Sequence, residues 1–440
     1  MKSRHIPRLI LAVIATIAPA TSATAQTIVV GTGNPDVDVP TVQAAVDQGG
    51  EIILQGHFSF NRPPTVPTAT PFVGGLATVL VSKPVAISGT QDGEMTSIEG
   101  GTTPFYVEAP GVPVTIQRLR FIRPKGDAIL VYAVSGLMIA SCRIDGLEPL
   151  PTISAGEGFD IITSRGIPLP TNAGKPENIS GTLLIANNDI DLAGGTAQAN
   201  TNGVLISSVG VPGAEVEVYV SGNKIRNTTE PAINFRRIVG RAYIERNVIA
   251  TGALVGTAGN PQAIRVVNTG SYLIAHNSID CTWPGGDAEG IGVFSQVAAW
   301  PMERAIVVDN DVTMSAPEGT VFTQESAGIA VRGFAQGNVV QDNRIRGRAR
   351  AALSVDVFPK PPDPRPSGFP ANNAFVLNRL DHFEASLADV FVDDGVVNTL
   401  IVGPGTVEDH GVGTIIVPMR PRGDDEDGHD RGKRGKDDAR

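Results

Sequence analysis

The sequence has few aromatic residues and lacks long runs of helix-forming residues. Phe, Trp and Tyr make up 5% of the 440 residues, whereas Gly occurs 50 times and Pro 33 times. Val, Ile, Asn and Thr are common, and these residues favour strands and turns. The composition therefore predicts a chain rich in β-strands and turns.

An excess of positive charge is also missing. The formal net charge is −10 at pH 7, which argues against a nucleic-acid partner because phosphates are neutralised by clustered basic residues. No apolar run after residue 25 approaches the roughly 20 residues that span a bilayer, so we expect no membrane insertion. The ligands left open are neutral or cationic ones, or anionic ones held by local arginines.

The first 25 residues have the pattern of a signal peptide. Lys2 and Arg4 precede the apolar run from Leu9 to Ala18, and Ala23-Thr24-Ala25 has the form of a signal-peptidase site. The mature chain is then expected to begin at Gln26. A secreted or periplasmic protein follows from this interpretation.

The two cysteines do not suit a disulfide. In the repeat register given below, Cys142 and Cys281 lie about five coils apart, roughly 24 Å at about 4.8 Å per coil. A disulfide needs Cα atoms within about 7 Å of each other. We expect two free, buried thiols.

A motif recurs along the chain as an apolar residue, two variable residues, Asn, one variable residue and a second apolar residue. Its asparagines follow at intervals of 24 to 35 residues and are Asn188, Asn223, Asn247, Asn277, Asn310, Asn343 and Asn378. Asn tolerates the left-handed αL conformation, and stacked copies can hydrogen-bond as a ladder. The motif predicts a sharp bend at each Asn in a solenoid.

A second element precedes each Asn motif: a small residue followed by alternating apolar residues, as in Gly203-Val204-Leu205-Ile206 and Ala263-Ile264-Arg265-Val266. A period of two indicates strands. Each repeat is thus interpreted as a strand, a turn, a second strand, the bend at Asn, a short third strand and a variable loop.

With both elements, the chain resembles the pectate-lyase-like superfamily of right-handed parallel β-helices over residues 27–418, including a cap strand at Ile28–Val30 and a cap helix at Thr41–Asp47. The resemblance implies an all-β solenoid of three-strand coils. The expected boundaries are a signal peptide at 1–25, a cap with the first coil at 26–60, a Pro-rich loop at 61–78, the β-helix at 79–418 and a disordered charged tail at 419–440. The superfold hosts lyases, hydrolases, epimerases, esterases and non-catalytic proteins.

The alternation predicts which residues of the strand before each Asn motif face outward. One outward row is expected to be Leu130, Asp160, Leu205, Asn234, Arg265, Gly292, Ala330 and Ser354, and the next Tyr132, Ile162, Ser207, Arg236, Val267, Phe294, Arg332 and Asp356. Proteins that this chain resembles place their cleft on this sheet. The candidate catalytic residues are Arg236, Arg265, Arg332 and Asp356, because arginine can grip a uronate carboxylate and serves as the base in lyases of this superfold.

Substrate contacts are expected from Asn234, Phe294, Trp283, Trp300 and Tyr132, since three of these aromatic rings gather around one coil and can stack on sugar faces. Asp287 and Glu289 offer carboxylates for a calcium site or for a hydrolase pair. No cofactor is required by the sequence, and calcium is the one that fits. The alternative for all these polar residues is a solvated sheet face with an ordinary ion pair between Arg332 and Asp356.

Two functional hypotheses remain open at this stage. The first is a monomeric protein that binds polysaccharide along the first-sheet groove and cleaves it, with lyase chemistry preferred over glycoside hydrolysis. The second is a non-catalytic extracellular scaffold or adhesion protein that uses the stability of the solenoid alone.

Overall fold

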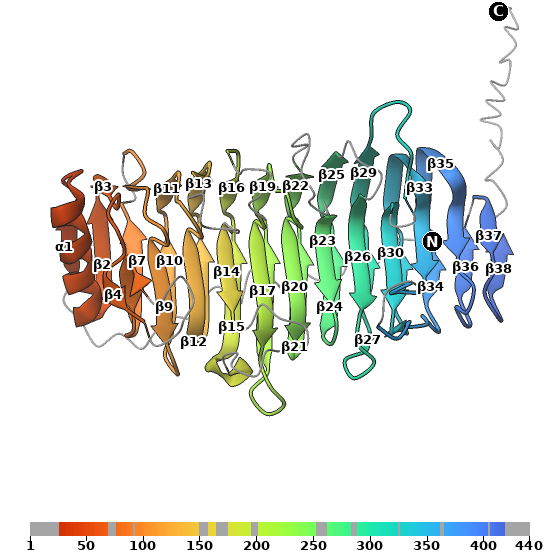
Figure 1. Ribbon diagram of the computed structural model, residues 1–440, viewed down its shortest axis with the longest axis horizontal. Helices are drawn as coiled ribbons and strands as arrows, with labels where there is room; N and C mark the ends of the chain where they lie inside the picture. The colour runs from red at the N-terminus through yellow and green to blue at the C-terminus, as the bar shows by residue number, and fades with distance from the viewer. Residues whose placement is uncertain are drawn as a thin grey trace, which may run out of the picture.

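The apolar side chains at alternate positions of each strand point into one elongated core. The chain coils around that core as a right-handed parallel β-helix (Figure 1). The computed structural model describes residues 26–68, 76–90, 93–148, 157–163, 175–194, 201–251, 262–282, 288–323, 326–360, 365–403 and 405–418. The expected signal peptide and charged tail lie outside these residues. The sequence prediction of the fold is confirmed.

Three parallel sheets run the length of the solenoid. The first sheet contains, in order, β6 (Val79–Val81), β9 (Phe105–Ala109), β12 (Ile129–Ala140), β14 (Phe159–Ile162), β17 (Val204–Val209), β20 (Ile233–Ile238), β23 (Gln262–Val267), β26 (Glu289–Ser295), β30 (Ala327–Gly333), β33 (Arg344–Asp356), β35 (Arg379–Val392) and β37 (Val407–Asp409). Strand β12 continues into the second sheet, and β33 and β35 enter the first sheet from the third.

The second sheet contains β1 (Thr27–Val30), β2 (Gly50–Gln55), β7 (Val85–Gly89), β10 (Val114–Gln117), β12, β15 (Ile179–Ala186), β18 (Val216–Ser221), β21 (Gly240–Glu245), β24 (Ser271–Ala275), β28 (Ile306–Val308), β32 (Val339–Gln341), β34 (Ala374–Val376), β36 (Leu400–Gly403) and β38 (Ile415–Pro418). The third contains β3 (His57–Ser59), β8 (Ser97–Glu99), β11 (Arg120–Ile122), β13 (Arg143–Asp145), β16 (Asp189–Asp191), β19 (Lys224–Arg226), β22 (Val248–Thr251), β25 (Ser278–Thr282), β29 (Asp311–Ser315), β33 and β35.

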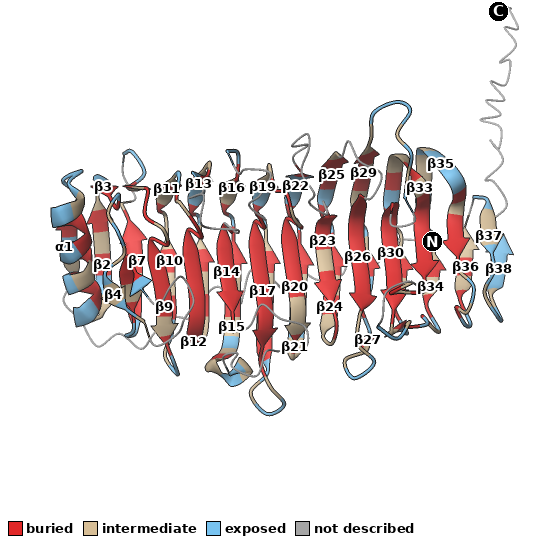
Figure 2. Ribbon diagram, in the orientation of Figure 1, coloured by how far each residue is buried: buried red, intermediate tan, exposed pale blue. Residues whose placement is uncertain are grey.

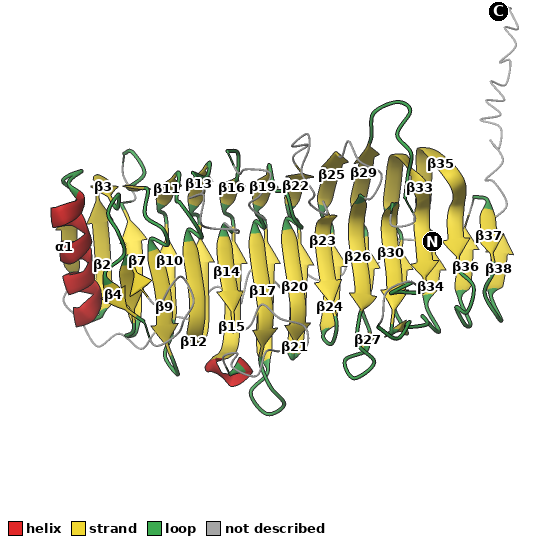
Figure 3. Ribbon diagram, viewed as in Figure 1, coloured by secondary structure: helices red, strands yellow, loops and turns green. Residues whose placement is uncertain are grey.

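Short strands and a short helix lie in the loops between the strands of the three sheets. The antiparallel pair β4 (Val66–Pro67) and β5 (Leu76–Ala77) lies within the expected Pro-rich loop, and β27 (Met302–Glu303) pairs with β31 (Ala335–Gln336). A 3-10 helix, η3 (Pro176–Asn178), precedes β15 (Figure 3). No helix among the described residues is long and apolar enough to cross a membrane.

Helix α1 (Pro35–Gln48) covers the N-terminal end of the core, as Figures 1 and 2 show. It begins six residues before the helix expected at Thr41, because Asn34 accepts a hydrogen bond from the amide of Asp36 and Pro35 occupies the first turn, where its missing N–H is not needed. Its inner face, which includes Val42 and Val46, is fully buried.

The asparagine ladder is present as expected. The side-chain amide of each ladder Asn donates to the Oδ1 of the next at 2.9–3.0 Å, from Asn188 to Asn378. The expected αL conformation is wrong for the asparagines themselves: it belongs to the preceding residue, such as His276 with φ of 57°. The Asn side chain is buried inside the bend, so the exposed neighbour takes the turn.

The two cysteines are free and buried, as expected. Strand β25, which holds Cys281, is four strand steps along the third sheet from β13, which follows Cys142 directly. The separation is thus four coils rather than five.

Candidate functional site

The outward register of the first sheet agrees with the sequence prediction. Pairing places Asp160 beside Leu205, Asn234 beside Arg265, and Arg332 beside Asp356 on neighbouring strands. The residues between them, such as Ile161 and Phe235, are fully buried in the core. The polar residues of these rows therefore lie on the outer face of the first sheet.

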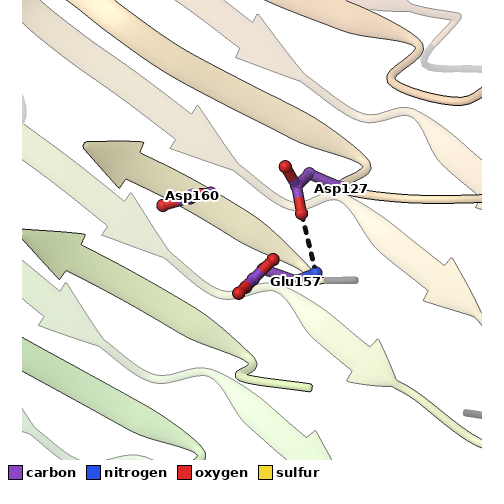
Figure 4. A group of neighbouring side chains, drawn as sticks. All are labelled: Asp127, Glu157 and Asp160. Carbon is purple, nitrogen blue, oxygen red and sulfur yellow. Dashed lines mark hydrogen bonds between the residues drawn. The ribbon is translucent and has the colours of Figure 1, made fainter. Parts of the chain in front are cut away.

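An acidic cluster lies on this face where β12 and β14 begin (Figure 4). One carboxylate oxygen from each of Asp127, Glu157 and Asp160 lies within 4.8 Å of the others, and all three residues are buried. The backbone amide of Glu157 donates to Asp127 Oδ1 at 2.9 Å, which fixes the Asp127 carboxylate. Carboxylate oxygens this close can bind a cation such as calcium, so this cluster is the group among the described residues that is able to hold a metal ion.

Amide side chains continue from the acidic cluster along the sheet. Asn234 on β20 donates from Nδ2 to Oδ1 of Asn202 at 3.0 Å, and both residues are buried. Arg236 Nε lies 3.4 Å from Asn234 Oδ1. The sequence candidates Asn234 and Arg236 thus belong to one hydrogen-bonded group next to the acidic cluster.

Aromatic rings pack on two arginines, one on β20 and one on β23. The guanidinium carbon of Arg265 lies 4.7 Å from the ring centre of Phe294, and that of Arg237 lies 4.6 Å from the Trp300 ring. Such stacking fixes the plane of the guanidinium group. Burial lowers the pKa of Arg237 from its ordinary value.

Arg332 occupies a different environment. Its NH1 lies 2.5 Å from Glu289 Oε1, and its Nε lies 3.4 Å from Asp356 Oδ2. Gln262 donates to the other Glu289 oxygen at 2.6 Å, and Arg350 lies 3.5 Å from Asp356. Glu289, Arg332 and Asp356 therefore form a buried ion network two to four strands beyond Asn234.

The remaining sequence candidates are not part of these groups. Tyr132 packs with Tyr106 and Leu130 in a small apolar cluster on the outer face, and burial, followed by the nearby Glu108, raises its pKa. Trp283 and Asp287 lie outside the described residues. The expected metal site of Asp287 and Glu289 is therefore described only at Glu289, whose carboxylate contacts Arg332 and Gln262.

Sequence reasoning missed a third outward row. The polar residues of this row each lie two residues before the first large apolar core residue of their strand: Asp127, Glu157, Asn202, Gln262 and Glu289. In every case a small residue, Ala or Gly, separates the polar residue from that core residue. The small residue breaks the period of two, since Ala128 and Ile129 are consecutive residues of the core. The alternation therefore does not predict that Asp127 and Glu157 face outward.

No family model matches the sequence, and no curated protein matches it. The fold is similar to several solved structures. The A-module of the mannuronan C-5 epimerase AlgE4 of Azotobacter vinelandii is 12% identical, with 89% of this chain and 96% of that chain covered and a TM-score of 0.44. PfbA, a surface adhesin of Streptococcus pneumoniae, is 11% identical, with coverage of 80% and 90% and a TM-score of 0.48.

A tailspike protein of E. coli bacteriophage HK620, solved in complex with a pentasaccharide, is 10% identical, with coverage of 88% and 77% and a TM-score of 0.42. At these identities the likeness concerns the fold alone. By its stacked three-strand coils and parallel sheets, this chain has the right-handed parallel β-helix fold.

Proposed function

We propose that this protein binds an acidic polysaccharide along the outer face of the first sheet and hydrolyses its glycosidic bonds at the acidic cluster. The proposal rests on Asp127, Glu157 and Asp160, whose carboxylate oxygens lie within 4.8 Å of one another. A row of amide side chains and arginines lies next to them on the same sheet. Export through the signal peptide at residues 1–25 is part of this proposal.

Hydrolysis of a glycosidic bond uses two carboxyl groups, one of which protonates the leaving oxygen while the other attacks the sugar or activates water. Asp127 is held by the amide of Glu157, so Glu157 and Asp160 are the pair assigned to the reaction and Asp127 positions Glu157. The short spacing of the carboxyl groups is nearer to the roughly 5–5.5 Å of retaining enzymes than to the roughly 6.5–9.5 Å of inverting ones. We expect retention of anomeric configuration.

Substrate binding is assigned to the coils that follow. Arg265 on β23 is three strand steps from Asp160 on β14, roughly 14 Å at the usual strand spacing. A planar guanidinium binds carboxylate or sulfate groups through paired hydrogen bonds. Arg236 and Arg265 would thus hold acidic sugars beyond the bond that is cleaved. Phe294 supports Arg265, and Trp300 packs on the neighbouring Arg237.

The lyase chemistry expected from the sequence is less well supported. An arginine base must lose a proton, and Arg332 lies between the carboxylates of Glu289 and Asp356, which stabilise its charged form. We therefore assign Arg332 and Asp356 a structural role in the site and not a catalytic one. Arg236 and Arg265 remain the candidates for a lyase base, with calcium at the acidic cluster.

The test is incubation of the purified chain from Gln26 onward with a panel of uronate-containing and neutral polysaccharides, in calcium and in a chelator. We expect new reducing ends without the ultraviolet absorbance of an unsaturated uronate, and we expect the activity to survive chelation. If the new ends show this absorbance, and if the activity is lost on chelation and restored by calcium, the protein is a lyase and not a hydrolase. Binding without new ends would support a non-catalytic carbohydrate-binding role, and the absence of both would favour a scaffold.

A further inference from the structure

The outer face of the second sheet carries a continuous stripe of apolar side chains across ten neighbouring strands, from β12 to β38. The pairing register aligns these residues one above another: Met138, Leu184, Tyr219, Tyr243, Leu273, Ile306, Val339, Ala374, Leu400 and Ile415. We call this row the apolar stripe. Every member is half-buried or exposed, with Ile306 at 45% and Ile415 at 61%.

The adjacent outward row strengthens the stripe toward the C-terminus. It runs through Ala140, Ala186, Ser221, Glu245, Ala275, Val308, Gln341, Val376, Val402 and Val417. Glu245 is the single charged residue in the two rows together, all of which lie in the described part of the chain. From β24 onward the face is therefore almost entirely aliphatic.

The third sheet shows how a solvated face of the same solenoid is built. Its outward rows hold ion pairs between neighbouring strands, including Arg120 with Asp145, Arg226 with Asp189, and Arg346 with Asp311. Soluble monomers rarely expose a large contiguous apolar patch, and such patches mark interaction surfaces. The contrast between the two sheets indicates that another molecule covers the outer face of the second sheet when the protein functions.

We propose that a second copy of this chain covers the apolar stripe, so that two solenoids associate side by side through their second sheets. The stripe and its neighbouring row measure about 43 Å by about 13 Å from ordinary strand dimensions, which gives roughly 550 Å² on each copy and roughly 1,100 Å² in total. This total exceeds the roughly 1,000 Å² that a specific interface needs and lies near the lower end of stable interfaces, which is about 1,200 Å². A face that carries a single charge, at Glu245, and is otherwise mostly apolar can pack against a copy of itself, as a two-fold contact requires.

Two further observations fit this partner. Tyr219 and Tyr243 are stacked at 4.8 Å with an angle of 8° between their rings, which makes a rigid aromatic platform of the kind enriched in interfaces. The segment that follows β38 in the sequence, residues 419–440, is dominated by charged residues and Gly. Its composition does not suit it to cover aliphatic side chains. This proposal of a dimer departs from the monomer expected from the sequence. It does not depend on the proposed function, because the first sheet stays open.

The test is sedimentation equilibrium of the chain from Gln26 onward, from low micromolar to several hundred micromolar concentration. We expect a dimer for the wild type. The double variant Ile306→Lys/Val308→Lys places four cations in the contact, and its dissociation constant should rise at least about 100-fold. Val248→Lys, which replaces an equally exposed apolar residue at 50% exposure on the third sheet, should remain dimeric.

Circular dichroism and thermal unfolding establish that each variant is folded. A wild-type monomer at every concentration would overturn the proposal, and so would a double variant that dimerises as well as the wild type. A wild-type monomer that sediments with neutral phospholipid vesicles, and loses this behaviour in the double variant, would assign the stripe to a lipid surface instead.

Discussion

The guanidinium of Arg332 lies 2.5 Å from the carboxylate of Glu289 on the adjacent strand, and both side chains are almost completely buried. Asp356 approaches the same guanidinium from the other side at 3.4 Å. Burial of charge is costly unless an opposite charge and hydrogen bonds compensate it. This network therefore holds the coils from β26 to β33 in one arrangement next to the arginines that we assign to substrate binding.

Replacing the central cation should destabilise the solenoid. Arg332→Met leaves Glu289 and Asp356 buried without the cation between them, and removing one partner of a buried ion pair costs about 3–5 kcal/mol. Urea unfolding followed by circular dichroism measures this loss. Arg348→Met, which removes the exposed contact with Glu384, should change the free energy of unfolding by less than about 1 kcal/mol; equal losses in the two variants would contradict this account.

The asparagine ladder should depend on the buried side chain and not on the αL residue beside it. Asn277→Ala removes the donors to Ile244 O and Asn310 Oδ1, together with the acceptor for Asn247. Buried groups left unsatisfied cost about 1–3 kcal/mol each, so a loss of at least about 2 kcal/mol is expected in urea unfolding. His276→Gly, at the αL position, should be neutral or stabilising, and a larger loss there than at Asn277 would be inconsistent with the ladder.

The two thiols should resist modification in the native protein. Burial raises the pKa of both Cys142 and Cys281 to about 12, and the thiolate is the reactive form. A chromogenic disulfide reagent at pH 8 should titrate no thiol in the folded chain and two after unfolding in guanidinium chloride. Rapid reaction of either cysteine before unfolding would contradict the packing described for it.

The ion pairs of the third sheet should make stability depend on pH in the acidic range. Burial opposes ionisation of Asp145, but hydrogen bonds from Arg143 and Arg120 outweigh it and lower its pKa from the ordinary 3.8. A carboxyl group with a lowered pKa in the folded state stabilises the protein above its ordinary pKa, and this contribution is lost as the pH falls through the folded-state value. The free energy of unfolding should decline below about pH 4, and the decline should be shallower in Asp145→Asn; identical pH profiles would exclude this contribution.

The sequence was sufficient for the coil register because two periodic signals agree. The Asn motif locates the bends, and the period of two before it identifies which residues face outward, so the neighbours of Asn234 and Arg332 were placed correctly. Both signals come from local sterics and burial, which recur in every coil. Helix α1 was predicted from the sequence, but its predicted start at Thr41 is too late because the helix continues through Pro40.

The acidic cluster was not predicted, because its members come from different coils and from loops whose lengths vary. Asp127 and Glu157 are 30 residues apart in the sequence, and only the stacking of β12 on β14 brings them together. Likewise, only one of the two acidic partners of Arg332 was predicted from the sequence. Asp356 was recognised as its neighbour, whereas Glu289 was assigned to a metal site with Asp287.

The central claim is that the acidic cluster cleaves a glycan, and the most direct measurement is the rate of reducing-end formation by Asp160→Asn on the polysaccharide that the wild type cleaves. We predict a fall of roughly 100-fold to 10,000-fold, the usual worth of a positioned acid or base, with polysaccharide binding retained. Asp280→Asn, which changes an exposed carboxylate on the third sheet, should keep the wild-type rate. A wild-type rate in Asp160→Asn would show that the cluster does not carry the reaction.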